Sequence, residues 1–275
     1  MSAPARPVRP ARSSALLSWL APLGPIGAAT LFVLNTLGGA TLMLGRILRA
    51  FFPPRFDAHE ASRQLYHVGV RSAPIVAMTA LFTGAIMVIQ TAYFVQRTGA
   101  TSLLGYGVGF SVFAEIGPVL IGLMFSGRVG ANNTAELGTM VVTEQVDALR
   151  ALAIDPIRYL VVPRFIAMMV MLTLLMVLGD LFAIIGAAAT AQVLIGLDWR
   201  VLVQNLIESN LLDELIMGLV KAGSFGVAIS CISCHFGLTV SGGAVGVGRA
   251  TNNSVVANAT AIFVIDFLVG WLYSL

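Results

Sequence analysis

Four ionisable residues interrupt long apolar stretches of this sequence: Glu115, Asp180, Lys221 and Asp266. A charge at the centre of a bilayer costs on the order of 3 kcal/mol on insertion scales, so each is expected to face protein or a water-filled path. Glu115 stands just before Gly117-Pro118, where the helix must loosen because proline removes a backbone hydrogen bond. A carboxylate at such a break is the best candidate for a residue that lines a substrate path.

Two of these residues have a simpler interpretation. Lys221 lies six residues from the predicted outer end of its apolar stretch, and a lysine there can snorkel toward the membrane surface. Asp266 lies near the middle of the last stretch, which favours a buried hydrogen bond to a neighbouring helix. Both uses are structural, and they compete with a role in a substrate path.

The sequence Cys-Ile-Ser-Cys-His, from Cys231 to His235, matches the pattern of covalent haem attachment. That attachment belongs to an exposed segment on the outer side of the membrane, whereas this motif lies in an apolar stretch near its predicted inner end. Cysteine is also common as a small buried residue. We favour the buried-residue interpretation, and we predict no metal site.

The chain has no residues for hydrolysing ATP. A P-loop needs a lysine followed by serine or threonine after a glycine-rich turn, but the only lysine, Lys221, is followed by Ala222. Neither a Ser-His-Asp pattern nor a zinc-binding pattern is visible. We therefore predict a non-catalytic chain that binds no cofactor and takes its energy from a partner.

The composition indicates an integral membrane protein. Of the 275 residues, 57% are hydrophobic and only 11% are charged, whereas soluble domains carry roughly 25% charged residues. A membrane-spanning helix needs roughly 20 apolar residues. We predict an all-α fold whose five spans lie at about 73–95, 101–126, 165–197, 215–236 and 255–275.

The segments before the first span differ in character. Residues 1–14 are basic and rich in proline, and we expect a disordered tail there. Residues 15–50 are apolar but contain Pro22 and Pro25 and carry arginines at both ends, which favours an interfacial or re-entrant segment over a span. A second surface helix is predicted at 56–70, so that interfacial helices fill 15–72 and the permeation domain fills 73–275.

Arginine placement predicts the orientation. With the N-terminus inside and the C-terminus outside, thirteen arginines lie on the inner side and two on the outer side. These arginines flank apolar segments, which indicates membrane orientation and no nucleic-acid partner. The polar stretch 136–164 is then cytoplasmic, and 198–214 is expected to be a helix on the outer surface.

Within the cytoplasmic stretch, residues 142–153 show the pattern of a short amphipathic helix. Its apolar stripe consists of Val142, Val146, Leu149 and Ala153. Its polar stripe consists of Thr143, Asp147 and Arg150. Asp155-Pro156 ends the helix because a residue before proline is pushed out of the α region. The pattern fits a docking helix for a soluble partner or an ordinary solvated loop helix.

Two short segments at predicted inner boundaries are similar to one another. Gly127-Arg128 is followed by Asn132-Asn133-Thr134, and Gly248-Arg249 is followed by Asn252-Asn253-Ser254. The spacing differs by one residue. We interpret the similarity as a shared capping role at helix ends.

Five blocks of the sequence resemble the MlaE/YrbE family of ABC-transporter permeases, the membrane subunits of Mla-type phospholipid transporters. The blocks are RQLYHVGV (63–70), EIGPV (115–119), SGRVGANNTAELGTMVVTEQVDALRALAIDP (126–156), PRF (163–165) and GRATNNSVV with DF (248–256, 266–267). The resemblance runs from about Arg63 to the C-terminus, and its long middle block is the most specific part.

This resemblance implies a homodimer of five-span subunits with N-terminal interfacial helices in a bacterial inner membrane. It implies two cytoplasmic MlaF-like ATPase subunits, which bind ATP and magnesium, and in many systems a small MlaB-like STAS-domain protein. A hexameric MlaD-like MCE protein is implied on the periplasmic side. The implied function is phospholipid movement between the inner membrane and the MCE carrier, which maintains the lipid asymmetry of the outer membrane.

The resemblance also implies two sets of site residues. The helix that couples to the ATPase would contain Glu144, Gln145, Asp147, Ala148 and Leu149. An outward-opening lipid pocket between subunits would be lined by Glu115, Ile116, Met87 and Val95. Several relatives carry arginine directly before the glutamate, where this chain has Ala114. We hypothesise that Arg97, at the outer end of the first span, supplies that positive charge instead.

Other functions stay open from the sequence. The Cys231–His235 motif would fit a haem-carrying membrane electron-transfer subunit. Glu115, Asp180 and Asp266 would fit the proton path of a self-sufficient secondary transporter. A sterol or another lipid is an alternative to phospholipid as the transported molecule.

Overall fold

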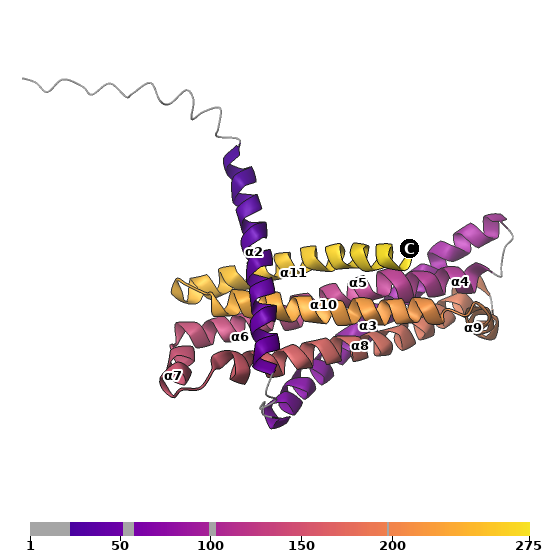
Figure 1. Cartoon of the computed structure of the whole chain (residues 1–275). Helices are drawn as coiled ribbons and strands as arrows, with labels where there is room; N and C mark the ends of the chain where they lie inside the picture. Colours follow the sequence, from indigo (N-terminus) through magenta and orange to yellow (C-terminus); the bar gives the residue numbers. More distant parts are fainter. Residues whose placement is uncertain (1–22, 52–57, 99–102, 197) are drawn as a thin grey trace, which may run out of the picture. The chain divides into compact units, whose positions relative to one another are not determined.

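The computed structural model describes residues 23–51, 58–98, 103–196 and 198–275, and every regular element in these ranges is a helix (Figure 1). The predicted all-α membrane fold is confirmed for this part of the chain. The tail predicted at 1–14 lies outside it, as does the beginning of the predicted interfacial segment. The side chains of residues 94–98, 103 and 104 are also outside the description.

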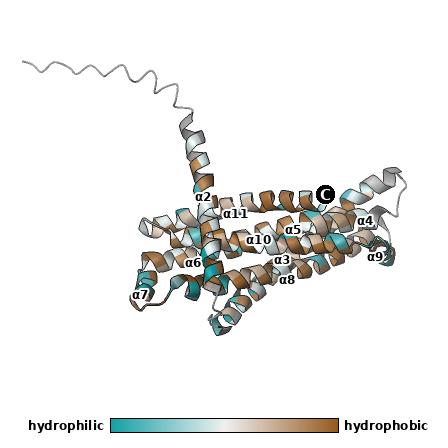
Figure 2. Ribbon diagram, in the orientation of Figure 1, coloured by the Kyte–Doolittle hydropathy of each residue, from teal (hydrophilic) through white to brown (hydrophobic). Residues whose placement is uncertain are grey.

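Five helical runs are long and apolar enough to cross a membrane. They are His59–Tyr93, Gly105–Val142, Ile157–Leu194, Leu212–Leu238 and Gly243–Tyr273. Each predicted span overlaps one of these runs, and Figure 2 shows their mainly apolar colouring. The chain is therefore a multi-pass membrane protein.

The chain divides into two compact units, residues 1–39 and 40–275, and helix α2 (Leu23–Phe51) runs through the division. In the second unit, Met43 and Ile47 of α2 are buried in an apolar cluster with Leu137 and Phe165. Interfacial placement of α2 stays a prediction.

Helix α3 (Ala58–Thr98) is continuous over 41 residues. It contains the whole span predicted at 73–95 and residues 58–70 of the surface helix predicted at 56–70, which the sequence suggested were separate; residues 56 and 57 lie outside the described ranges. At 1.5 Å per residue such a helix is about 60 Å long, roughly twice the hydrocarbon thickness of a bilayer. Its polar first part therefore extends beyond the apolar layer as a helix.

The next run is one long helix with two π-helical segments. Its parts are α4 (Leu103–Phe110), η1 (Ser111–Ile116), α5 (Gly117–Phe125), η2 (Ser126–Gly130) and α6 (Ala131–Val142). The span predicted at 101–126 thus continues as helix for sixteen further residues. Local π-helical segments occur frequently at functional sites, and each of these two carries a charged residue, Glu115 or Arg128.

The remaining elements complete the bundle. They are α7 (Gln145–Ala151), η3 (Ile157–Val161), α8 (Val162–Thr190), η4 (Ala191–Ile195), α9 (Trp199–Glu208), α10 (Leu212–Leu238) and α11 (Gly243–Tyr273). The helix expected within 198–214 is α9. It begins where the Asp198 carboxylate accepts a hydrogen bond of 2.9 Å from the Arg200 amide, as an N-cap does.

Helices α3 and α8 approach each other closely. A Cβ atom on Gly84 would overlap the carbonyl oxygen of Ala183, and one on Gly186 would overlap that of Leu81. Small residues allow such backbone contact between membrane helices. The central core then joins α3, α5, α8, α10 and α11 through Val76, Ile121, Phe125, Leu172, Phe225 and Ile262.

Candidate functional site

The short helix α7 lies at one end of the bundle, between α6 and α8 (Figure 1). Two residues with left-handed backbone flank it, Glu144 with φ +58° and Ala153 with φ +59°. At Ala153 the left-handed residue ends the helix in a Schellman motif, because the Ala153 amide donates to the Arg150 carbonyl at 3.0 Å and the Ile154 amide donates to that of Leu149 at 2.9 Å. The helix predicted at 142–153 is therefore confined to 145–151, and Val142 is the last residue of α6.

The two faces of α7 follow the predicted amphipathic order. Val146 is buried and Leu149 is half-buried, whereas Asp147 and Arg150 are exposed and form an ion pair at 2.7 Å. Glu144, Gln145 and Ala148 are also exposed. The side chains assigned to ATPase coupling thus lie at the surface of α7 or of its first turn, apart from Leu149.

A hollow of about 360 Å³ lies beside α7. Gln145, Ala148 and Leu149 form one wall, and Leu152, whose side chain is 70% exposed, extends it. The other walls come from Glu60, Arg63, Met140, Tyr159, Leu160 and Arg164. An exposed apolar residue beside a hollow with charged walls can receive a side chain from a docking partner.

The apolar part of the bundle contains an ionic cluster around Lys221. The Lys221 ammonium lies 3.1 Å from Glu115 Oε1 and 2.8 Å from Asp266 Oδ1, and it donates a 2.7 Å hydrogen bond to the Ala114 carbonyl. The contact to Ala114 is a hydrogen bond, and the contacts to the two carboxylates are ion pairs. Three of the four predicted intramembrane charges thus meet. Lys221 is fully buried and does not snorkel.

Proline explains why a backbone carbonyl is available to Lys221. In an α-helix the Ala114 carbonyl would accept from the residue four positions later, which is Pro118, and proline has no N–H. The π-helical segment η1 lies at the same place. The Lys221 ammonium takes over as the donor, so the loosened turn and the buried lysine stabilise each other.

The ionic cluster is open on one side. The side chain of Glu115 is 42% exposed and that of Asp266 is 17% exposed, although both lie in the apolar part of the bundle. Helix α11 carries exposed apolar residues, including Phe263, Phe267 and Trp271. A carboxylate therefore faces outward from the bundle next to an apolar helix surface.

The remaining pocket residues are only partly brought together. Met87 is buried in an apolar cluster against which Ile116 packs. Val95 and Arg97 lie on α3, but their side chains are outside the described part of the chain. Their assignment to the lipid pocket stays a prediction.

Asp180, the fourth predicted intramembrane charge, does not belong to the ionic cluster around Lys221. It is buried on α8, and its Oδ1 atom has no hydrogen-bond partner among the described residues. It lines a cavity of about 10 Å³ together with Thr83 and Gly117, close to the smallest space that holds one water.

The cysteines have a packing role. Cys231 and Cys234 are buried in the cluster that contains Leu137 and Phe165, and Asn133 donates to the Cys234 sulfur at 3.3 Å. This is the small buried role that the sequence favours. Among the described residues, no group of three or more His, Cys, Asp or Glu is placed to hold a metal ion.

The capping role predicted for the two similar segments is wrong. Both Asn-Asn-Thr/Ser triplets lie inside helices, α6 and α11, because the chain continues as helix beyond the apolar layer. They meet across the bundle, where Thr134 Oγ1 donates to Ser254 Oγ at 2.9 Å. The similarity in sequence therefore marks an interhelical contact.

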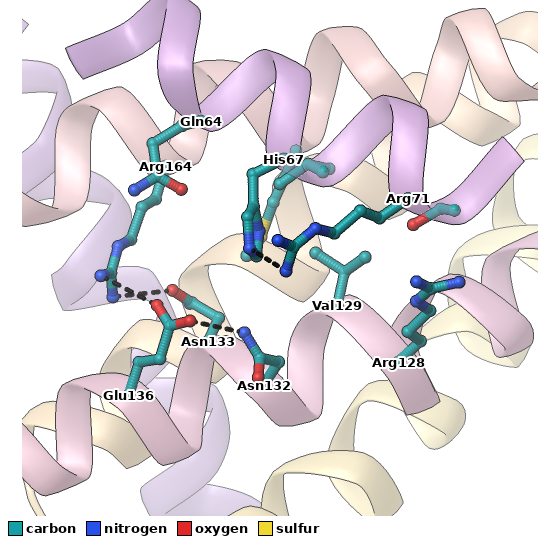
Figure 3. A pocket seen from close by; sticks show the side chains of 12 residues that line it. Gln64, His67, Arg71, Arg128, Val129, Asn132, Asn133, Glu136 and Arg164 are labelled. Carbon is teal, nitrogen blue, oxygen red and sulfur yellow. Dashed lines mark hydrogen bonds and ion pairs between the residues drawn. The ribbon is translucent and has the colours of Figure 1, made fainter.

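A further cavity with charged walls, which the sequence does not indicate, lies at the α7 end of the bundle (Figure 3). His67, Arg71, Arg128 and Arg164 line it from three helices. In the sequence these arginines served only as flanking charges for separate spans, and nothing in their spacing indicates that they meet.

Comparison with known proteins agrees with this architecture. The family model described as Permease MlaE matches residues 61–272. A probable ABC transporter permease of Rickettsia felis is 37% identical over 247 residues, which cover 90% of this chain and 95% of the relative. A probable ABC transporter permease of Synechocystis is 36% identical over 236 residues, covering 86% and 90%.

A plant protein also matches. The chloroplastic protein TRIGALACTOSYLDIACYLGLYCEROL 1 of Arabidopsis thaliana is 30% identical over 228 residues, which cover 83% of this chain and 65% of the relative. The family match and the two bacterial relatives each span most of the described bundle. The chain therefore belongs to the MlaE permease family and is the membrane permease of an ABC transporter, a class that works with a partner ATPase.

Proposed function

We propose that this permease moves phospholipids through a pocket that contains Glu115, with a partner ATPase docked on α7. The observation that carries the proposal is the ionic cluster of Glu115, Lys221 and Asp266, which is partly open although it lies in the apolar part of the bundle. Such a site suits a molecule with a polar headgroup and long apolar chains. The name of the Arabidopsis relative, which contains that of a diacylglycerol lipid, also supports a lipid substrate.

In the proposed pocket, the lipid chains lie against the apolar surface near Met87 and Ile116, and the headgroup lies near Glu115. Arg97 is the proposed partner of the lipid phosphate, because Ala114 offers no charge at the position before the glutamate. Val95 completes the outer part of the pocket. A second copy of the chain covers the open side, so that the pocket lies between two subunits of a homodimer.

The proposed energy input enters through α7. An MlaF-like ATPase binds ATP and magnesium and contacts the surface residues of α7, with Leu152 as an apolar contact beside the hollow. In this arrangement α7 and the N-terminus lie in the cytoplasm and the C-terminus lies in the periplasm, as the arginine distribution favours. An MlaD-like MCE protein exchanges lipid with the pocket, and an MlaB-like STAS protein binds the ATPase.

The proposed location is a bacterial inner membrane, and the proposed outcome is lipid asymmetry of the outer membrane. The proton-path alternative loses support from the contacts of Lys221, which hold Glu115 and Asp266 in ion pairs. The haem alternative loses support from the burial of both cysteines.

Co-purification tests the proposal. The tagged chain is isolated in mild detergent, and its bound proteins and lipids are identified by mass spectrometry. We expect an ATPase, an MCE protein and phospholipid. Asp147→Arg should release the ATPase and keep the lipid, because Asp147 is exposed on α7.

The matched control is Asp213→Arg, an exposed charge reversal at the start of α10. It should retain the ATPase. Release of the ATPase by both variants would contradict docking on α7. A bound sterol without phospholipid would contradict the proposed substrate and leave the permease role unchanged.

A further inference from the structure

A cavity of about 170 Å³ lies between α3, the η2–α6 segment and α8 (Figure 3). By the same measure one water needs roughly 10–15 Å³, so the cavity has room for a larger group. Its polar lining includes Gln64, His67, Arg71, Arg128, Asn132 and Arg164. We call it the basic cavity.

The basic cavity lies at one end of three apolar runs. Arg71 comes just before the apolar part of α3, Arg128 comes just after α5, and Arg164 comes just before the apolar part of α8. These positions place the cavity at the membrane boundary on the side of α7. Thirteen residues separate Glu115 from Arg128 along one helix, which is roughly 20 Å at 1.5 Å per residue. The basic cavity is therefore distinct from the ionic cluster of Glu115.

Of the three arginines that line the basic cavity, Arg164 is the one that pairs with a carboxylate among the described residues. Arg164 Nη2 lies 3.2 Å from Glu136 Oε2, and Arg164 Nη1 donates to Asn133 Oδ1 at 3.2 Å. The other oxygen of Glu136 accepts from Asn132 Nδ2 at 2.7 Å. Both carboxylate oxygens of Glu136 thus have partners, Arg164 and Asn132.

Among the described residues, no carboxylate pairs with Arg71 or Arg128. Arg71 Nη1 lies 2.7 Å from His67 Nε2, and because a guanidinium only donates, the ring nitrogen accepts. Within the part of the chain that the structure describes, Arg128 makes no ion pair and no hydrogen bond. Figure 3 shows both side chains on the same side of the cavity.

A buried hydroxyl adds a second, independent observation. Ser72 lines the basic cavity, its side chain is only 2% exposed, and its Oγ atom has no hydrogen-bond partner in the described structure. Buried polar groups normally have a partner, so an unpaired one in a cavity wall indicates a missing donor or acceptor. A phosphate oxygen would accept from this hydroxyl.

We propose that the basic cavity binds the phosphate group of an anionic phospholipid in the leaflet next to α7. Arg71 and Arg128 supply the charge, since the planar guanidinium matches phosphate geometry, and Ser72 donates a further hydrogen bond. Val68, Val129 and Met168 in the walls, and the position at the membrane boundary, favour a lipid headgroup over free phosphate. The proposal does not depend on which lipid is transported.

The test measures the dissociation constant of short-chain phosphatidylglycerol by native mass spectrometry of the full chain in mild detergent. Arg71→Gln and Arg128→Gln should each weaken binding about tenfold, the loss expected for one charge-assisted hydrogen bond. Ser72→Ala should weaken it several-fold with no change of charge. Co-purification of the ATPase with each variant confirms folding, because it depends on α7 and not on the basic cavity.

Arg249→Gln is the matched control. Arg249 is exposed near the start of α11, does not line the basic cavity and has no ion pair in the described residues. Equal weakening by Arg249→Gln would show a general charge effect and overturn the site. Inorganic phosphate that binds as tightly as the lipid would overturn the headgroup assignment. Unchanged binding in all arginine variants would overturn the proposal and leave the permease role intact.

Discussion

Lys221 compensates the charges of Glu115 and Asp266 in the apolar part of the bundle. It is the only lysine of the chain, and it is fully buried with a carboxylate on either side and a backbone carbonyl as its third acceptor. Removing one member of a buried charge cluster leaves the others without compensation, and such changes are strongly destabilising.

Lys221→Met should therefore lower the free energy of unfolding by about 3–5 kcal/mol, the usual effect of breaking a buried ion pair. Thermal unfolding in mild detergent measures this as a lower Tm. A triple variant that adds Glu115→Gln and Asp266→Asn should recover part of the loss, because it removes the uncompensated charges. If the Tm of the triple variant is below that of Lys221→Met, then unpaired charges on Glu115 and Asp266 are not what destabilises the Lys221→Met protein.

At this scale the sequence predicted which residues are unusual but not how they pair. Glu115, Lys221 and Asp266 stood out because each is a charge in an apolar stretch, and Gly117-Pro118 marked the place where the helix loosens. Their meeting depends on how α10, which carries Lys221, packs against both η1 and α11. Arg71 and Arg128 did not stand out, because arginines beside apolar segments are ordinary in membrane proteins.

Among the elements, α7 is the one on which we propose that the ATPase docks. Its turns use left-handed residues that are not glycine, and its apolar side leaves Leu152 exposed beside a hollow. The amphipathic pattern predicted the helix and the faces of its central part, where Val146 is buried and Asp147 and Arg150 are exposed. It did not predict the bounds: Val142 and Ala153 of the predicted apolar stripe are exposed and lie outside α7, which the left-handed turns at Glu144 and Ala153 flank.

Leu152→Asp should weaken ATPase docking at least tenfold without lowering Tm, since the side chain is 70% exposed and contributes little to folding. A pull-down against the purified ATPase measures the loss. Ile207→Asp, at an exposed position on α9, is the control and should bind normally. Normal docking of the Leu152 variant would remove this residue from the interface.

Over the whole molecule, the five spans in the described residues followed from hydrophobicity, as each predicted span overlaps one helical run, whereas setting 15–50 apart from them also needed its prolines and flanking arginines. The continuous α3 and the extension of α5 into α6 did not follow from hydrophobicity, because polar residues past the apolar layer can be either loop or helix. Tertiary contacts such as the hydrogen bond from Thr134 of α6 to Ser254 of α11 stabilise the helical conformation of these polar residues.

Backbone contact between α3 and α8 also has a measurable consequence. Gly186→Ala should lower stability by about 1–3 kcal/mol or more, the range for overpacking, because the added Cβ meets the Leu81 carbonyl. Gly248→Ala is the control on α11, where a Cβ meets nothing. It should be neutral or stabilising by up to about 1 kcal/mol, because alanine favours helix. Equal Tm values for the two variants would contradict the close approach.

At Gly84 and Gly186 the backbones of α3 and α8 meet with no side chain between them, so the two helices cannot slide past each other at these points without a clash. Ten residues connect the end of α7 to the start of α8, and the last five of them form η3, so we expect a displacement of α7 to reach α8 through this connection. We therefore expect α3 and α8 to move together as one rigid unit. We expect relative motion to occur instead at α11, whose apolar window is only 17% buried and which the salt bridge from Lys221 to Asp266 joins to α10.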